Sequence, residues 1–150
     1  MKVSRMYFED FEPGRVVHTA PTLITKEKMM AFARDYDNIP LHTDEDYAKT
    51  SIFGDLIAPG VMSFMSVWVK FLELDLFGRE LIAGKSTKIE WHKPVYAGDV
   101  LTGTVTVTNL VRRSAKNGIV EVTVEVRNQH GILVLTDVTE SVIKCREVTP

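Results

Sequence analysis

An aspartate and a histidine lie on either side of a proline in the segment from residue 37 to residue 42. Asp37 precedes Pro40, and His42 follows it. A carboxylate and an imidazole held close together can take a proton from a water molecule and return it later, which is general acid–base catalysis. Proline cannot continue a helix and restricts the residue before it, so we expect irregular backbone from Asp37 to His42. The same residues also fit two structural roles, an aspartate that caps its own turn and a histidine that bonds the local backbone.

Two short helices are predicted on either side of this segment. Thr25 is expected to cap a helix that runs to about Tyr36, because apolar residues recur at helical spacing after it. Thr43 and Asp46 form a Thr-x-x-Asp start signal for a second helix, which Gly54 interrupts. The candidate pair would therefore lie between two helices, on backbone of the kind that often carries catalytic residues.

A third helix is predicted to begin at Pro59 and Gly60. Its residues from Val61 to Leu72 are apolar on nearly every face, which indicates that the helix is buried. The N-terminus of a helix presents free backbone N–H groups and a favourable dipole to an anion. Gly60 is therefore a candidate for binding a negatively charged oxygen. The structural alternative is a glycine that only relieves strain after the proline.

The sequence changes from helical to strand-like periodicity after Gly78 and the Gly84 region. Strands are expected over residues 16–23, 87–92, 104–108, 119–126 and 133–144. Asn117-Gly118 is predicted to form a tight hairpin turn, and His130-Gly131 marks the next reversal. An antiparallel meander facing the central helix is expected, which is an α+β architecture.

Composition indicates a single domain over residues 1–150 and argues against several classes of function. The chain is 45% hydrophobic with a formal net charge of -2, and its scattered basic residues do not suggest binding to nucleic acid or to a membrane. No apolar run suits a signal peptide or a membrane span, so we expect a cytoplasmic protein. The single cysteine, Cys145, cannot form an intramolecular disulfide. His18, His92 and His130 are not spaced like metal ligands, and we expect no metal.

Three segments of the chain occur in the order found in one known family. They read Asp37-Asn38-Ile39-Pro40-Leu41-His42-Thr43-Asp44, Phe53-Gly54-Asp55-Leu56-Ile57-Ala58-Pro59-Gly60 and Trp91-His92-Lys93-Pro94-Val95-Tyr96-Ala97-Gly98-Asp99-Val100-Leu101. Together with the opening Tyr7-Phe8-Glu9-Asp10-Phe11, they resemble the MaoC-like dehydratases, or R-specific enoyl-CoA hydratases, of the hot-dog superfamily. Two residues depart from the pattern: Ile39 stands where many members carry a polar Asn or Gln, and Pro59 replaces a frequent His.

The resemblance implies a hot-dog fold, usually paired into a homodimer across the sheet edge. It also implies hydration of a 2-enoyl thioester, or the reverse dehydration, with an acyl-CoA as the substrate. Asp37 and His42 would handle the water, and the backbone N–H of Gly60 would bind the thioester oxygen. No cofactor is expected beyond the CoA that the substrate carries. Two alternatives stay open, a hot-dog thioesterase and a non-catalytic module that binds acyl thioesters.

Overall fold

The structure, a computed structural model, describes residues 5–147 of the chain. Residues 1–4, on which the expectation about a signal peptide partly rests, lie outside the described residues. The elements in chain order are η1 (Phe8–Asp10), β1 (Val16–His18), β2 (Thr22–Leu23), α1 (Lys26–Tyr36), α2 (Pro40–Thr43), α3 (Glu45–Thr50), α4 (Gly60–Leu72), η2 (Gly78–Glu80), β3 (Leu81–Trp91), β4 (Val100–Arg112), β5 (Asn117–Arg127) and β6 (Leu133–Lys144).

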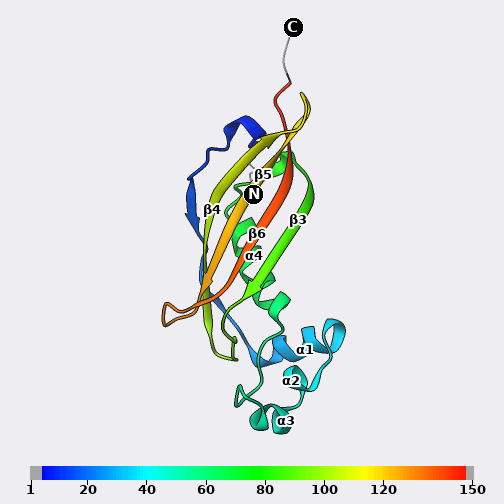
Figure 1. Cartoon of the computed structure of the whole chain (residues 1–150), viewed down its shortest axis with the longest axis vertical. Coiled ribbons are helices and arrows are strands. Elements are labelled where there is room, and N and C mark those ends of the chain that lie inside the picture. The colour runs from blue at the N-terminus through cyan, green and yellow to red at the C-terminus, as the bar shows by residue number, and fades with distance from the viewer. Residues whose placement is uncertain (1–4, 148–150) are drawn as a thin grey trace.

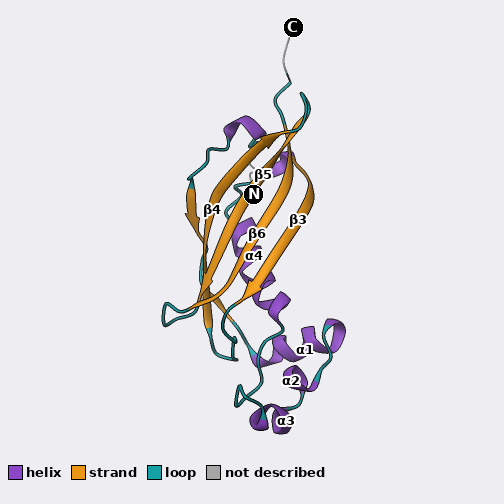
Figure 2. Ribbon diagram, in the orientation of Figure 1, coloured by secondary structure: helices purple, strands orange, loops and turns teal. Residues whose placement is uncertain are grey.

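The long strands form one antiparallel sheet that curves around α4 (Figures 1 and 2). The strand order is β1-β4-β5-β6-β3, with β2 also paired to β4. The meander prediction is confirmed for β4, β5 and β6. It is wrong for β3, which pairs with β6 rather than with β4, its neighbour in the sequence. Alternating side chains reveal a strand but not its partner, because the partner is chosen by contacts distant in sequence.

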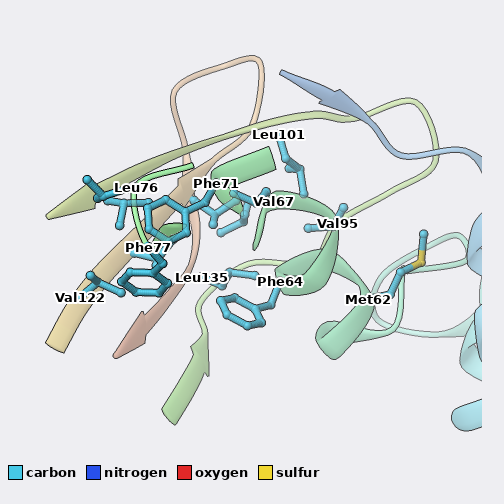
Figure 3. Packing of buried hydrophobic residues seen from close by; sticks show 14 of the residues in the cluster. Met62, Phe64, Val67, Phe71, Leu76, Phe77, Val95, Leu101, Val122 and Leu135 are labelled. Atoms are coloured by element: carbon cyan, nitrogen blue, oxygen red, sulfur yellow. The ribbon is translucent and has the colours of Figure 1, made fainter. Parts of the chain in front are cut away.

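The core lies between α4 and the concave face of the sheet (Figure 3). Val67 and Phe71 of α4 are buried against sheet residues such as Val122 and Leu135. Gly103 allows this close packing, because a Cβ atom there would lie 2.5 Å from Cγ1 of Val67. A single helix wrapped by an antiparallel sheet is the hot-dog arrangement, so the expected fold class is confirmed.

The expectation that α4 is buried holds for only one face of the helix in the single chain. Beside the face that packs in the core, α4 carries a second apolar stripe. Its residues are each close to half exposed: Val61, Met65, Val69 and Leu72. Beside it lies β3, an edge strand whose residues are exposed along almost its whole length. The helix α4 is therefore apolar on two faces, and the single chain buries only one of them. No helix within residues 5–147 is long and apolar enough to cross a membrane.

Several predicted boundaries differ from the structure for local reasons. The strand expected over residues 16–23 is divided into β1 and β2, and Pro21, which has no N–H for a sheet ladder, lies between them. Gly84 lies inside β3 beside an irregularity of register, instead of at a helix exit. The reversal at His130 and Gly131 is confirmed, and Gly131 has a φ of +74°.

The Asn117-Gly118 pair does not form the hairpin turn but lies at the start of β5. The chain reverses just before it, over residues 114–116. Gly118 has a packing role instead, because a Cβ atom there would lie 2.5 Å from Cδ2 and Cε2 of Phe8. The missing side chain lets the aromatic ring of η1 lie directly on the strand.

Candidate active site

The helices α1, α2 and α3 form a separate lobe beyond one end of the sheet (Figure 1). Thr25 caps α1 as predicted, with its Oγ1 accepting from the N–H of Lys28 at 3.2 Å. The cap of α3 is Asp44, whose Oδ1 accepts from the N–H of Tyr47 at 3.1 Å. The prediction of Thr43 as this cap is wrong, because its hydroxyl donates to the carbonyl of Ile39 instead.

The expected irregular backbone covers only the first half of the segment from residue 37 to residue 42. Asp37 ends α1, and a new helical turn, α2, begins at Pro40 and contains His42. Proline at the first position of a helix needs no hydrogen-bonded N–H and already has a helical φ, so it can start a helix that it could not continue. The turn places His42 opposite the residue that ends α1.

The structure brings Asp37 and His42 into direct contact. Nε2 of His42 lies 3.2 Å from Oδ2 of Asp37, with the histidine side chain buried and the aspartate side chain 44% exposed. On the other side of the ring, Nδ1 lies 2.7 Å from the carbonyl oxygen of Ile57. A carbonyl oxygen only accepts hydrogen bonds, so Nδ1 must carry a proton and donate it.

This bond determines what faces the aspartate. With Nδ1 protonated, a neutral His42 presents a lone pair at Nε2, and the ionised Asp37 also presents only lone pairs. Two acceptors repel at 3.2 Å unless a proton lies between them. A hydrogen bond within the pair therefore needs a proton on one of the two facing atoms, while the exposed part of the carboxylate can still accept a hydrogen bond from water.

The pair lies in the wall of a pocket with a volume of about 400 Å³. All three segments that carry the family resemblance contribute to it. The lining residues are Asp37, His42, Phe53, Ile57, Ala58, Gly60, Val61, Ser63, Trp91, His92, Lys93, Pro94 and Val95. Most of this surface is apolar, and the acid–base pair is one of few polar features, as expected for a small-molecule site.

The loop that precedes α4 is held by the segment that follows β3. The hydroxyl of Tyr96 donates to the carbonyl of Phe53 at 2.8 Å, and the N–H of Ala58 donates to the carbonyl of Val95 at 2.7 Å. Ile57 and Tyr96 also form an isolated antiparallel bridge. The loop therefore holds the carbonyl of Ile57 in place, and that carbonyl orients His42.

Gly60 lies at the first position of α4 and lines the pocket. The first N–H groups of a helix have no carbonyl partner within it, so the N–H of Gly60 is available to a ligand. The structure adds a reason for glycine that was not weighed from the sequence. A Cβ atom at Gly60 would lie 2.4 Å from Cε2 and 2.5 Å from Nε1 of Trp91, so the indole ring occupies the space of the missing side chain.

Sequence reasoning did not single out Trp91 or Ser63 as pocket residues. Trp91 and Lys93 belong to the third resemblance segment, which could have placed them near the site. The two departures, Ile39 and Pro59, are not among the lining residues. Of the other histidines, His92 bonds the hydroxyl of Thr136 and His18 that of Thr104.

Within residues 5–147, no three His, Cys, Asp or Glu side chains gather as metal ligands would.

Comparisons with known proteins agree with the fold and identify the family. The family described as MaoC like domain matches residues 10–130. The uncharacterized protein YdeM of Bacillus subtilis is 28% identical over 140 residues, covering 93% of this chain and 99% of the relative. An (R)-specific enoyl-CoA hydratase of Rhodospirillum rubrum is 36% identical over 107 residues, covering 70% and 72% of the two chains. The solved structure of a monoamine oxidase regulatory protein from Archaeoglobus has a TM-score of 0.90 at 30% identity, covering 95% of this chain and 96% of the other.

Proposed function

This chain belongs to the MaoC-like domain family, and from that membership we propose that it catalyses the reversible addition of water to a 2-enoyl thioester, with an acyl-CoA as the substrate. The observation that carries the proposal is the contact between Asp37 and His42 in the wall of the pocket that also contains the N-terminus of α4. The relatives described above include an (R)-specific enoyl-CoA hydratase. Hydration is neither oxidation nor reduction, so the reaction needs no redox cofactor.

In this proposal, the Asp37–His42 pair takes a proton from a bound water molecule. The water oxygen forms a bond to the β-carbon as its O–H bond breaks, and the electron pair of the C=C bond moves toward the thioester oxygen. The protonated pair then returns a proton to the α-carbon as the electron pair moves back, which completes the addition. Dehydration is the same sequence in reverse.

The negative charge that develops on the thioester oxygen requires a donor that is in place beforehand. The N–H of Gly60 supplies one, at the positive end of the dipole of a 13-residue helix. Both groups line one pocket, so the water and the thioester oxygen can bind to different walls of it.

We also propose that the protein acts as a homodimer that pairs through β3. An exposed edge strand offers a row of unpaired backbone groups, which natural proteins usually cover or pair. Beside β3, the exposed stripe of α4 supplies the apolar contact, and a two-fold axis would bring the same surface from both copies together. Val61 belongs to this stripe and also lines the pocket, so the second copy would close one side of the site.

The proposed reaction is tested with the purified protein and a panel of 2-enoyl-CoA thioesters of different chain lengths. Loss of the conjugated thioester absorbance is followed together with free thiol. We expect absorbance loss without thiol release, and none with Asp37→Asn. Thiol release would instead identify a thioesterase. Tight binding of every thioester with no turnover would identify a non-catalytic binding module.

A further inference from the structure

We propose that Trp91 is a second donor to the thioester oxygen, so that its indole N–H and the backbone N–H of Gly60 bind that oxygen together. This assignment rests on the proposed hydration reaction and adds a residue that the family resemblance did not single out. Trp91 ends β3, where it is paired with Leu135 of β6, and its side chain extends to the start of α4.

The position of the indole follows from the space at Gly60. The site of a Cβ atom on Gly60 is 2.5 Å from Nε1 of Trp91. In any residue, the backbone nitrogen and the Cβ position are about 2.5 Å apart. The two nitrogens are therefore within about 5 Å of each other, and a single oxygen can lie about 2.9 Å from both, the usual length of an N–H···O bond.

The indole N–H is free to take this role. Within residues 5–147, Nε1 of Trp91 makes no hydrogen bond, and Trp91, which lines the pocket, is 52% exposed as a residue. The N–H of Gly60 is likewise an unpaired donor at a helix start. Two free donors close together in one apolar pocket form a binding site for a carbonyl oxygen that gains negative charge.

The chemistry of tryptophan also suits this position. Its indole nitrogen donates a hydrogen bond but does not accept one, and it neither loses nor takes up a proton near neutral pH, so it does not compete with the Asp37–His42 pair for the proton. Ser63, another polar residue in the pocket, is less available, because its hydroxyl donates to the carbonyl of Pro59 at 3.4 Å and is buried. His92 is already bonded to Thr136.

The first test compares Trp91→Phe with Trp68→Phe. Phenylalanine at position 91 keeps an aromatic ring against Gly60 but removes the donor, whereas the change at Trp68 removes an indole that does not line this pocket. We expect Trp91→Phe to lower kcat by about 10- to 100-fold with little change in KM, because the lost bond acts mainly on the charged intermediate. Trp68→Phe should leave kcat within about two-fold.

The second test does not require turnover. A chromophoric cinnamoyl-CoA thioester is bound to Asp37→Asn, and its absorbance maximum is compared with that in the double variant Asp37→Asn, Trp91→Phe. Donors at the thioester oxygen polarise the conjugated system, so we expect a shift to longer wavelength that the double variant largely loses.

The outcomes separate this assignment from the proposed function. Hydration by the wild type with an unchanged kcat and an unchanged absorbance shift in the Trp91→Phe variants would overturn the role of Trp91 and leave the hydratase intact. A Trp91→Phe variant that changes only KM would show that Trp91 only packs against the substrate, and this result would also overturn its role as a donor. No hydration by the wild type, with a cinnamoyl shift that still depends on Trp91, would overturn the hydratase and retain the donor pair. Neither hydration nor a shift would overturn both.

Discussion

His42 donates its Nδ1–H to the carbonyl oxygen of Ile57 over 2.7 Å, and this bond decides which ring nitrogen faces Asp37. The geometry of the Asp37–His42 pair therefore depends on two separate segments of the chain. The segment from residue 37 to residue 42 brings the carboxylate and the ring together. The loop that carries Ile57 fixes which ring nitrogen of His42 holds the proton.

Asp37→Asn should lower kcat by about 10²- to 10⁴-fold, because an amide cannot take the proton from water. His42→Ala should do the same. Asp35→Asn serves as the matched control, since Asp35 is an exposed carboxylate close by in α1. The measurement is hydration rate beside thermal unfolding, and near-normal rates in both site variants would rule out the pair.

Tyr96→Phe should test the loop that carries Ile57 without changing Asp37 or His42. Loss of the hydroxyl that donates to Phe53 removes one hydrogen bond, worth about 1 kcal/mol of unfolding free energy. We also expect kcat to fall several-fold, because the carbonyl of Ile57 becomes less firmly held. Tyr47→Phe, in an exposed tyrosine, is the comparison. Equal effects of the two changes on kcat would contradict this role of the loop.

Gly60→Ala should act through Trp91. The new methyl group would overlap the indole ring, which is half exposed and can move aside, so we expect normal folding with an altered tryptophan fluorescence. The hydration rate should fall by about 10-fold or more, as the two donors separate. In a Trp91→Ala background the same substitution should have little further effect, since the two changes share one cause. Additive losses would point to another cause.

Asp137 should make stability depend on pH. It is fully buried on β6, and burial raises its pKa, although hydrogen bonds from Thr139 and Thr87 act in the opposite direction. The hydroxyl oxygen of Thr139 lies 2.5 Å from Oδ2, that of Thr87 contacts Oδ1, and the two hydroxyl oxygens are 2.8 Å apart. Three oxygen contacts need three protons, and the two hydroxyls supply only two. A protonated Asp137 supplies the third by donating to one threonine hydroxyl, which then donates to the other threonine.

The sign of this dependence follows from the raised pKa. The folded state binds the proton more tightly than the unfolded chain, so the contribution of Asp137 is full below the unfolded pKa of about 3.9 and is lost as pH rises above it. Asp137→Asn resembles the protonated acid at every pH. We therefore expect the stability of the wild type relative to Asp137→Asn to fall between about pH 4 and neutrality, as measured by urea unfolding. A difference that stays constant or grows over this range would show that Asp137 is ionised in the folded protein.

Met65→Glu should weaken the proposed dimer. A carboxylate on the exposed apolar stripe of α4 would be buried without a partner in both copies, which we expect to raise the dissociation constant by about 100-fold or more. Ile52→Glu is the matched control, because Ile52 is 95% exposed and lies outside this stripe. Sedimentation measures both, and an unchanged oligomeric state in Met65→Glu would exclude this surface as the interface.

Features that depend on near neighbours in the chain were predictable from the residues alone. Thr25 marks the start of α1 because a capping bond reaches only three residues along the chain. Asp37 and His42 were predictable as a pair because few residues separate them, and Gly131 was predictable as a turn because its positive φ favours glycine. The alternating valines of β5 showed a buried face for the same local reason.

Features that join segments distant in the chain became visible only in the folded structure. The pairing of β3 with β6 brings Trp91 onto Gly60, and no local pattern contains that contact. The bond from His42 to Ile57 and the exposed stripe of α4 are of the same kind. The periodicity of a segment predicts which of its residues share a face. Packing between segments far apart in the chain decides what that face contacts.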